Sequence, residues 1–438
     1  MSDRSSIPSS ADPARTPIGR RTFVAGAAAG AVPLIMPSIS RAAGRGEDTL
    51  TVGVIGCGGR GSGAARNALE ASEDVRLVAM GDLFPDRLEQ SRANLANFDP
   101  ARATVADENC FTGFDAYKGV LSTDCDLVIL ATPPGFRPDH FAAAIAAGKH
   151  VFTEKPVGVD GTGIRKVLAA GEEADRKGLC VVAGTQRRHE NSYLAAMAQL
   201  HGGALGEMVA GRCYWNMGGL WNVAPDPARS EMENQCRNWL YYPWLSGDHI
   251  VEQHVHNLDV INWAFGAHPE RVFGVGGRQA RTGADYGVIF DHFGLEYGYP
   301  DGRFALSMCR QQTGTPGKVE EIVTGTNGRM TMRPGFARID SGTESGDAWR
   351  YRGPNNNPYV TEHVDLQRAI RSGHHLNEAQ NVAHSTLTAI MGRESAYTGQ
   401  EISWEQALNS QQDLMPAVLA FTECPTPPVP IPGKTKFV

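Results

Sequence analysis

One short segment of this 438-residue chain holds side chains well suited to proton transfer. Within Gly247–Asp259, Glu252 and His256 are four residues apart, a spacing that places both side chains on one face of a helix. A histidine can exchange a proton near neutral pH, and a carboxylate one helical turn away can tune it. We therefore predict acid–base chemistry for Glu252 and His256, whereas Asp259 is expected to be structural.

The same segment also raises the question of a metal site, because it contains His249, His254 and His256. A His-x-His pair on a helix directs its two rings to different faces, and no matching group of ligands follows elsewhere in the chain. The eight cysteines are scattered without a C-x-x-C pair, and they are expected to be small buried apolar residues. The sequence therefore predicts no metal.

A glycine-rich turn near the start of the chain is suited to binding a dinucleotide. Gly56-Cys57-Gly58-Gly59-Arg60-Gly61 fits G-x-G-x-x-G and directly follows the β-rich run Thr49–Ile55. Its glycines permit a tight turn, a close approach of the backbone to a pyrophosphate, and close packing of the next helix. A second strand-like run ends at Asp82, whose carboxylate suits the ribose hydroxyls of adenosine, and 83–85 supply no basic residue for a 2′-phosphate. NAD is therefore favoured over NADP.

The elements that must position these residues alternate between strand and helix, which indicates an α/β fold. We predict a doubly wound Rossmann domain over residues 48–185, a second domain over 186–415 and a Pro-rich C-terminal tail over 416–438. The predicted strands of the first domain are Thr49–Ile55, Val75–Met80, Leu127–Ala131, His150–Thr153 and Leu179–Ala183. The predicted helices are Ala64–Ala71, Arg137–Ala147 and Gly163–Arg176.

A longer stretch of this domain carries a family resemblance. The run Ala131-Thr132-Pro133 … His140 … Ala147-Gly148-Lys149-His150-Val151 … Glu154-Lys155-Pro156 resembles the glucose–fructose oxidoreductase, inositol dehydrogenase and rhizopine-catabolism (Gfo/Idh/MocA) oxidoreductase family. The resemblance extends from the glycine turn to the stretch Glu362–Glu394. It implies that the Rossmann domain is joined to an α+β domain with a large open, mostly antiparallel sheet. Such sheets commonly pair, so a homodimer or homotetramer is expected.

The resemblance also implies roles for individual residues. In the family, the lysine of the E-K-P motif touches the nicotinamide ribose and the substrate oxygen, and Lys155 stands at that position. Glu252 matches the family's acid and His256 its histidine, so Lys155, Glu252 and His256 are predicted to be catalytic. The chain departs from the family pattern in having Glu in place of Asp at 252 and His254 in place of a small residue. The residues predicted to bind the cofactor are Gly56, Gly58, Gly59, Arg60, Gly61, Asp82, Thr132, Pro133, His140, Glu154, Lys155 and Gln186.

Side chains that could contact a substrate lie beyond the first domain. Arg187 could bind substrate oxygens and His254 could add a contact, although a structural role for Arg187 stays open. Aromatic side chains are dense between residues 214 and 244 and could stack on the C–H faces of sugar rings. They could equally form the core of the second domain or an oligomer contact. The residues predicted to contact the substrate are Arg187, His254, Trp215 and Tyr242.

Residues 1–43 are predicted to be an export signal. Arg20 and Arg21 precede the weakly apolar run Ala25–Ile39, which is shorter than the roughly 20 residues that a spanning helix needs. This pattern resembles a twin-arginine signal, and the alternative is a disordered tail with an accidental arginine pair. We therefore expect export to the periplasm through the twin-arginine machinery, without a stable membrane span. Because no free NAD is supplied outside the inner membrane, the cofactor is expected to be tightly bound and recycled in each turnover.

Taken together, these features predict an exported NAD-dependent oxidoreductase acting on a secondary hydroxyl of a sugar, glycoside or polyol. The net charge of −7 and the lack of a basic run exclude recognition of nucleic acid through this surface. One alternative is an NAD-dependent glycosidase that works by oxidation, elimination and re-reduction. The relatives of this kind lack the E-K-P lysine, which Lys155 supplies here. The other alternative is a non-catalytic sugar-binding Rossmann protein.

Overall fold

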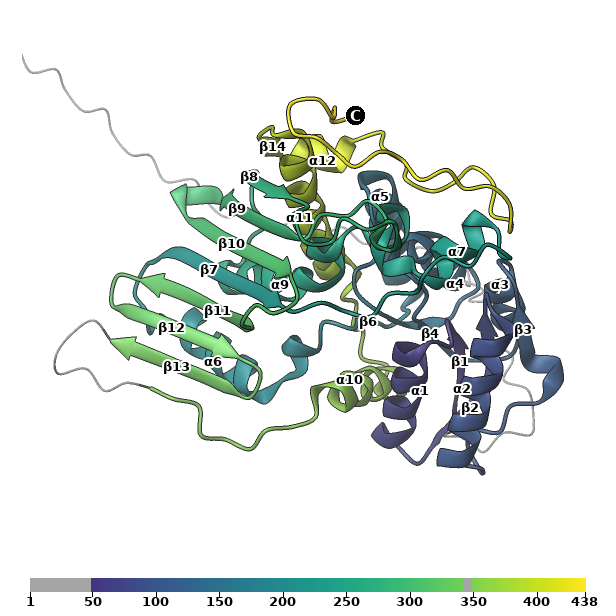
Figure 1. Cartoon of the computed structure of the whole chain (residues 1–438). Helices are drawn as coiled ribbons and strands as arrows, with labels where there is room; N and C mark the ends of the chain where they lie inside the picture. The colour runs from purple at the N-terminus through teal and green to yellow at the C-terminus, as the bar shows by residue number, and fades with distance from the viewer. Residues whose placement is uncertain (1–48, 342–348) are drawn as a thin grey trace, which may run out of the picture. The chain divides into compact units, whose positions relative to one another are not determined.

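The computed structural model describes residues 49–341 and 349–438 (Figure 1). The predicted twin-arginine signal lies outside these residues. Within the described ranges, no helix combines the length and the apolar character that crossing a membrane requires.

The first part of the described chain folds around a six-stranded parallel sheet with the strand order β3-β2-β1-β4-β5-β6. Strand β1 is buried along its whole length, as expected for a parallel strand with both faces covered. The strand order reverses between β1 and β4, and a crevice for a ligand forms at such a switch point. The prediction of a doubly wound Rossmann domain is therefore confirmed. Its strands are β1 (Leu50–Ile55), β2 (Val75–Asp82), β3 (Cys110–Thr112), β4 (Leu127–Leu130), β5 (His150–Thr153) and β6 (Val181–Ala183). Its helices are α1 (Gly59–Ala71), α2 (Pro85–Phe98), α3 (Ala116–Leu121), α4 (Arg137–Ala146) and α5 (Gly161–Lys177).

The second part is built on an eight-stranded sheet with the order β13-β12-β11-β7-β10-β9-β8-β14. Every neighbouring pair is antiparallel except β7 and β10, so the predicted open, mostly antiparallel sheet is confirmed. Its strands are β7 (Met208–Met217), β8 (Arg271–Gly277), β9 (His292–Gly298), β10 (Phe304–Gln311), β11 (Lys318–Gly325), β12 (Gly328–Arg333), β13 (Phe336–Ser341) and β14 (Ile402–Ser403). The helices of this part are α6 (Asn191–His201), α7 (Glu231–Arg237), α8 (Pro243–Ser246), α9 (Val255–Phe265), α10 (Pro358–Ser372), α11 (Ala379–Thr398) and α12 (Trp404–Asn409).

Two helices late in the sequence link the two sheets. Helix α10 packs on α1, and its Leu366 and Ala369 belong to the apolar core of the parallel sheet (Figure 1). Helix α11 packs on both α5 and β8. The strands of the two sheets therefore lie on either side of the predicted boundary at residue 185. Helix α10, although it comes after that boundary, packs against the first sheet's domain.

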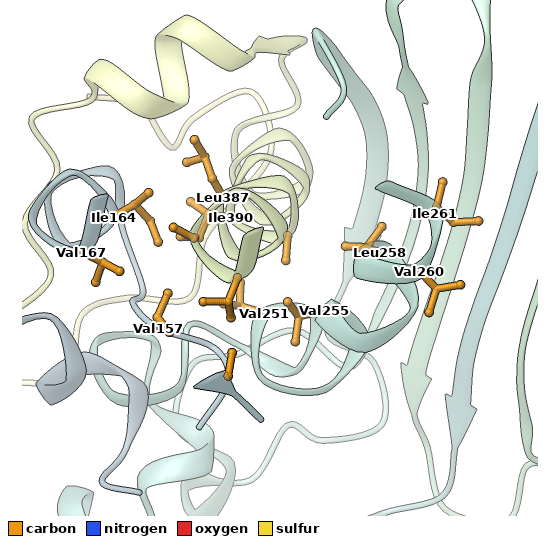
Figure 2. Close-up of a cluster of buried hydrophobic side chains, with 14 of the residues drawn as sticks. Val157, Ile164, Val167, Val251, Val255, Leu258, Val260, Ile261, Leu387 and Ile390 are labelled. Atoms are coloured by element: carbon orange, nitrogen blue, oxygen red, sulfur yellow. The ribbon is translucent and has the colours of Figure 1, made fainter. Parts of the chain in front are cut away.

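The segment that carries Glu252 and His256 is anchored by a buried apolar cluster (Figure 2). This segment begins as a single π-helical turn, η5 (Ile250–His254), and continues as α9. Figure 2 shows its apolar side chains meeting those of α5 and α11. The labelled members of this cluster on the three elements are Val251, Val255, Leu258, Val260, Ile261, Ile164, Val167, Leu387 and Ile390. Close packing of this kind fixes the direction in which the polar face of the segment points.

The start of the same segment is fixed by the buried carboxylate of Asp248. Its backbone adopts a φ of 75°, which is uncommon for a residue with a side chain. One carboxylate oxygen accepts hydrogen bonds from the backbone N–H of His249 at 2.5 Å and from its ring Nδ1 at 3.0 Å. The other accepts from the backbone N–H of Phe290 at 2.8 Å and from the hydroxyl of Tyr397 at 2.6 Å. These contacts tie the segment to the loop before β9 and to α11.

Candidate active site

A cleft of about 1160 Å³ extends from the glycine turn of the Rossmann domain to the segment with Glu252 and His256. All three predicted catalytic residues line it. The predicted cofactor residues that line it are Gly56, Gly58, Gly59, Arg60, Asp82, Thr132, Pro133, His140, Glu154, Lys155 and Gln186. The structure therefore brings together residues that are up to 200 positions apart in the sequence.

The glycine turn leaves space beside its backbone because its glycines have no side chains. Gly56 has a φ of +97°, and a Cβ on Gly61 would lie 1.8 Å from the carbonyl oxygen of Gly56. Gly58 and Gly59 are open, because the nearest atom to a Cβ on Gly58 is a guanidinium nitrogen of Arg87 at 3.8 Å, and a Cβ on Gly59 would meet none within 4 Å. Backbone N–H groups at the start of α1 are thus exposed to the cleft, which suits the pyrophosphate of a dinucleotide. Gly61 serves the packing of α1 on β1 and does not line the cleft.

Replacing Gly61 by Ala is therefore expected to destabilise the Rossmann domain by about 1–3 kcal/mol and to weaken dinucleotide binding. The added methyl group can only be accommodated if the turn and α1 move apart. Gly59→Ala is the matched control, since nothing lies within 4 Å of its Cβ, and its stability should equal that of the wild type. Thermal unfolding and NADH titration of both variants measure the difference. Equal behaviour of the two variants would contradict this account of the turn.

The carboxylate of Asp82 is held in place at the end of β2. It accepts the backbone N–H of Cys57 at 2.6 Å and that of Phe84 at 2.8 Å. Burial raises the pKa of Asp82, while these two N–H groups stabilise its charged form. The sequence favoured NAD over NADP partly because residues 83–85 include no basic side chain that could bind a 2′-phosphate. That argument needs one correction, because Arg87, in the first turn of α2, also lines the cleft. Asp82 nevertheless remains a carboxylate at the position where a 2′-phosphate would lie.

Lys155 and Glu252 form a pair at the other end of the cleft. The ammonium group of Lys155 donates to the backbone carbonyl of Glu252 at 2.6 Å and to its carboxylate Oε1 at 3.0 Å. The second carboxylate oxygen, Oε2, is buried and has no hydrogen-bond partner among the described residues. The pair therefore offers a charged donor and an unused acceptor beside each other in the cleft.

His256 completes this group. Its ring stacks on the indole of Trp215, with the ring centroids 5.7 Å apart and the planes at 23°. Burial lowers the pKa of His256 well below its ordinary value, and the nearby cations Lys155, Arg187 and Arg60 lower it further. The imidazole is consequently neutral at neutral pH and can accept a proton.

Arg60 joins the glycine turn to this catalytic end. Its guanidinium pairs with Glu154, reaches Glu362 at 3.4 Å, and lies 5.1 Å from the ring centroid of Tyr359. Burial alone would lower the pKa of Arg60, but the charges of the two carboxylates raise it above its ordinary value. Glu362 is fully buried, and that burial raises its pKa, as does the charge of Glu154. Gln186 donates to the Tyr359 hydroxyl at 3.3 Å, so α10 contributes directly to the wall of the cleft.

A buried arginine connects the loop after β4 to the E-K-P motif. Arg137 donates to the backbone carbonyl of Thr132 at 2.6 Å and to that of Pro156. Burial lowers the pKa of Arg137 to about 10, so it stays charged. The hydroxyl of Thr132 lies 3.1 Å from Nδ1 of His140, and burial lowers the pKa of His140 to about 3. Arg137 thus holds together two loops that carry predicted cofactor contacts.

The four predicted substrate residues do not line the cleft. His254 is fully buried, with its Nε2 2.7 Å from the hydroxyl of Ser307, because the π-helical turn directs its ring toward the sheet. Arg187 pairs with the buried carboxylate of Glu321. Trp215 is half-buried behind His256, and Tyr242 is buried at the start of α8. A direct substrate contact by any of these four residues does not fit this placement.

Several residues that the sequence reasoning did not single out line the cleft instead. Tyr359 lies three positions before the stretch Glu362–Glu394, and no motif in the sequence pointed to it. The other examples are Phe84, Arg87 and Phe136. Trp221 and Trp239 line the cleft as well, and they belong to the aromatic side chains between residues 214 and 244 that we expected could stack on sugar rings. Among the described residues, no group of three or more His, Cys, Asp or Glu side chains is arranged to hold a metal ion.

Two family models match the chain in sequence. The oxidoreductase family with an NAD-binding Rossmann fold (GFO_IDH_MocA) matches residues 50–184, and the GFO/IDH/MocA C-terminal domain matches residues 193–331. Together these matches cover well over half of the chain. The first match covers all six strands of the parallel sheet, and the second covers β7 to β11 and most of β12.

Curated relatives match part of the chain. The inositol 2-dehydrogenase of Acidothermus cellulolyticus is 27% identical over 241 residues, which are 55% of this chain and 60% of that protein. The 2,7-anhydro-N-acetylneuraminate hydratase of Escherichia coli is 26% identical over 221 residues, which are 50% of this chain and 54% of that protein. The chain therefore spans about 60% or less of the length of either relative.

Solved structures share the fold over most of the chain. The aldose-aldose oxidoreductase from Caulobacter crescentus complexed with glycerol has a TM-score of 0.64 at 17% identity, covering 81% of this chain and 99% of that chain. The scyllo-inositol dehydrogenase from Lactobacillus casei, with bound NAD(H) and scyllo-inositol, has a TM-score of 0.62 at 19% identity, covering 81% and 99%. At these identities the likeness shows the fold alone.

Proposed function

Because this chain belongs to the Gfo/Idh/MocA family of oxidoreductases with an NAD-binding Rossmann domain, we propose that it oxidises or forms a secondary hydroxyl of a sugar or polyol. The observation that carries the proposal is the meeting of Lys155, Glu252 and His256 in the cleft that also contains the glycine turn. The proposed cofactor site and the proposed proton-transfer groups share one cleft.

The residues present fit NAD. The glycine turn leaves room where a pyrophosphate needs it, and Asp82 is fixed where ribose hydroxyls need an acceptor. Gly56, Gly58, Gly59, Asp82 and Lys155 would hold the dinucleotide along the cleft. When bound, NAD supplies the hydride acceptor, and NADH the donor, for the carbon that carries the hydroxyl.

The chain's own residues handle the hydroxyl proton. A substrate hydroxyl beside Lys155 accepts a hydrogen bond from the ammonium group, which stabilises the negative charge that develops on oxygen as the proton leaves. The neutral imidazole of His256 takes that proton. Glu252 holds the ammonium of Lys155 through two contacts and orients it toward the same space. In the reverse direction, the imidazolium returns the proton to the carbonyl oxygen.

We infer the substrate class from the relatives and from the polar side chains that line the cleft. The relatives include inositol 2-dehydrogenases, and the solved neighbours include proteins with bound scyllo-inositol or glycerol. Closely spaced donors and acceptors in the cleft suit a molecule with many hydroxyls. A polyol or sugar with adjacent secondary hydroxyls is therefore the proposed substrate.

A second candidate is a net non-redox reaction in which oxidation is transient, such as cleavage of a glycoside by oxidation, elimination and re-reduction. The observation in its favour is that one relative, from Escherichia coli, is named as a hydratase. Accumulation of NADH with a simple polyol would favour the dehydrogenase. Release of a reducing sugar from a glycoside, with no net change in NADH, would favour this second candidate.

We further propose that residues 1–43 direct export by the twin-arginine route and that the folded enzyme carries its NAD with it. Support comes from Arg20 and Arg21 before the weakly apolar run and from the length of the cleft, which runs from the glycine turn to Lys155. Protein recovered from the periplasm should contain about one NAD(H) per chain when denatured and examined by mass spectrometry. Arg20→Lys together with Arg21→Lys should leave the protein in the cytoplasm. Periplasmic protein without nucleotide would contradict the retained cofactor, and export of the double variant would contradict the route.

The outer face of the large sheet supports the expected homodimer or homotetramer. Strands β8 and β10 alternate between buried and exposed positions, and the exposed positions are largely apolar. Strand β9 lies between them and presents Gly294 and the exposed Glu296 on the same face, so the apolar side chains of β8 and β10 flank one acidic residue. Exposed apolar side chains of this kind indicate a surface that another protein covers, and a second copy of this chain is the proposed partner. The exposed apolar side chains on these two strands are Phe273, Val275, Phe304, Leu306 and Met308.

A further inference from the structure

One wall of the cleft comes from an excursion of the chain between β7 and η5. We call residues 218–246 the cap; they contain α7, the short 3₁₀ turn η4 (Trp239–Tyr241) and α8. Four cap side chains line the cleft, namely Trp221, Val223, Cys236 and Trp239. The same cleft is lined by Asp82 and Arg87 of the Rossmann domain. The cap therefore encloses the part of the cleft where the adenosine of a dinucleotide would be held.

Arg237 fastens the cap to the loop after β2. Its two terminal nitrogens pair with the carboxylate of Asp86 at 3.1 and 3.2 Å. Its guanidinium carbon lies 3.9 Å from the ring centroid of Phe84. Glu233, one turn earlier on α7, orients the guanidinium through a third hydrogen bond at 2.9 Å. Since the backbone N–H of Phe84 also donates to Asp82, Arg237 holds the loop that positions the proposed ribose acceptor.

The C-terminal arm, residues 414–424, covers the same loop from a second direction. The ring of Phe421 stacks on that of Phe84, with the centroids 5.9 Å apart and the planes at 8°, and it contacts Phe114 at 5.2 Å. The arm is bound to the cap as well, since the backbone N–H of Cys424 donates to Glu231 at 2.9 Å. Figure 1 shows this C-terminal stretch running back past α7. Phe84 is thus held between Arg237 and Phe421.

A separate contact holds the cap at the loop after β4. Trp244 meets Phe136 edge-on at 5.8 Å, and a Cβ on Gly135 would lie 2.1 Å from the backbone oxygen of Trp244. The cap therefore bridges the loops after β2 and β4. The crevice at the switch point lies between the loops after β1 and β4, and the loop after β2 follows Asp82 at its edge. A dinucleotide bound in this crevice would lie beside both attachments of the cap.

We propose that Arg237 is the latch of a cofactor-retaining cap, so that breaking its contacts with Asp86 and Phe84 limits the release of NAD(H). The inference rests on the proposed function, because it explains how the chain would keep the cofactor between turnovers. Of the two attachments, the one at the β2 loop is the more readily opened. It depends on one ion pair with the exposed carboxylate of Asp86 and on ring contacts of Phe84, whereas the β4 loop is packed backbone to backbone.

The experiment measures how fast NADH leaves the full-length protein. Purified protein loaded with NADH is mixed with excess NAD, and the fall in nicotinamide fluorescence gives the release rate. Arg237→Met keeps the apolar stem and removes the charge, and it should release NADH at least about tenfold faster, which corresponds to 1.4 kcal/mol. Asp86→Asn should accelerate release as well. The double variant should be no faster than Arg237→Met, because both substitutions break the same pair.

The matched control is Arg66→Met on α1. Arg66 also combines an ion pair, with Glu70 at 2.8 Å, and a ring contact, with Phe98 at 4.2 Å, but it lies outside the cleft. Its NADH release should equal that of the wild type, and thermal unfolding checks that all variants are folded. Equal release rates in Arg237→Met and wild type would overturn the latch while leaving the proposed function standing. A wild-type protein that binds neither NAD nor NADH would overturn the proposed function itself.

Discussion

Replacing Lys155 by Met is expected to lower turnover of a polyol substrate by about 10²–10⁴-fold while the protein stays folded and keeps its NAD. Methionine has a similar length but cannot donate a hydrogen bond to the substrate oxygen. The negative charge that develops on that oxygen then loses its nearest cation. Because Gly56, Gly58, Gly59 and Asp82 would still hold the dinucleotide, its binding should change far less than turnover.

Two further variants separate this role from a structural one. Lys166→Met removes an exposed lysine that pairs only with Asp139, and it should leave turnover unchanged. Glu252→Gln keeps the hydrogen-bonding shape but removes the carboxylate charge, so it should lower turnover less than Lys155→Met does. Steady-state rates, NAD content and melting temperatures are measured for all three. Normal turnover by folded Lys155→Met protein would exclude Lys155 from the chemistry.

The second large effect concerns the charge of His256. Burial, and then the cations around the ring, hold its pKa well below the ordinary value of 6.5. The imidazole therefore stays neutral, and able to accept a proton, as the pH falls through 6.5. The rate of hydroxyl oxidation at low substrate should accordingly stay level through this range and decrease only at lower pH. His256→Gln, which cannot exchange a proton, should reduce the rate by about 10²–10⁴-fold at every pH.

The origin of this shift can be tested without a substrate. Lys155→Met removes the cation that contributes most after burial, so the pKa of His256 should rise toward 6.5. Lys166→Met should leave it unchanged. The titration of the ring is followed by NMR on protein with isotope-labelled histidine. A wild-type His256 that titrates near 6.5, or one that does not respond to the loss of Lys155, would contradict the proposed proton acceptor.

Much of the fold could be predicted from local patterns. The apolar strands before Gly56 and Glu154 are short and bounded by turn residues, and parallel strands covered on both faces have just this character. The fingerprint and the acid at Asp82 have a spacing fixed by the geometry of one βαβ unit. Glu252 and His256 both face the cleft because their segment is helical. In each case the contacts lie close together in the sequence.

The parts that could not be predicted depend on long-range packing. His254 belongs to the same histidine-rich segment as His256, but the π-helical turn directs it to Ser307 and away from the cleft. Trp215 stacks on the ring of His256 and does not line the cleft. Nothing in the sequence distinguishes an aromatic ring that contacts substrate from one that packs against another side chain. Tyr359 enters the cleft wall on α10, which packs on α1, and Arg237 contacts Phe84 and Asp86, so both depend on parts of the chain that are remote in sequence. Their roles follow only from the structure.

The central claim is that the cleft transfers a hydride between a polyol carbon and NAD(H). The most direct test incubates the purified protein with a polyol whose carbon-bound hydrogens are deuterium, and then identifies the released nucleotide by mass spectrometry. The account predicts NADH that carries one deuterium in the wild type, and unlabelled NAD in Lys155→Met. Unlabelled NAD from wild-type protein across a panel of inositols, sugars and glycosides, or the absence of any nucleotide, would contradict it.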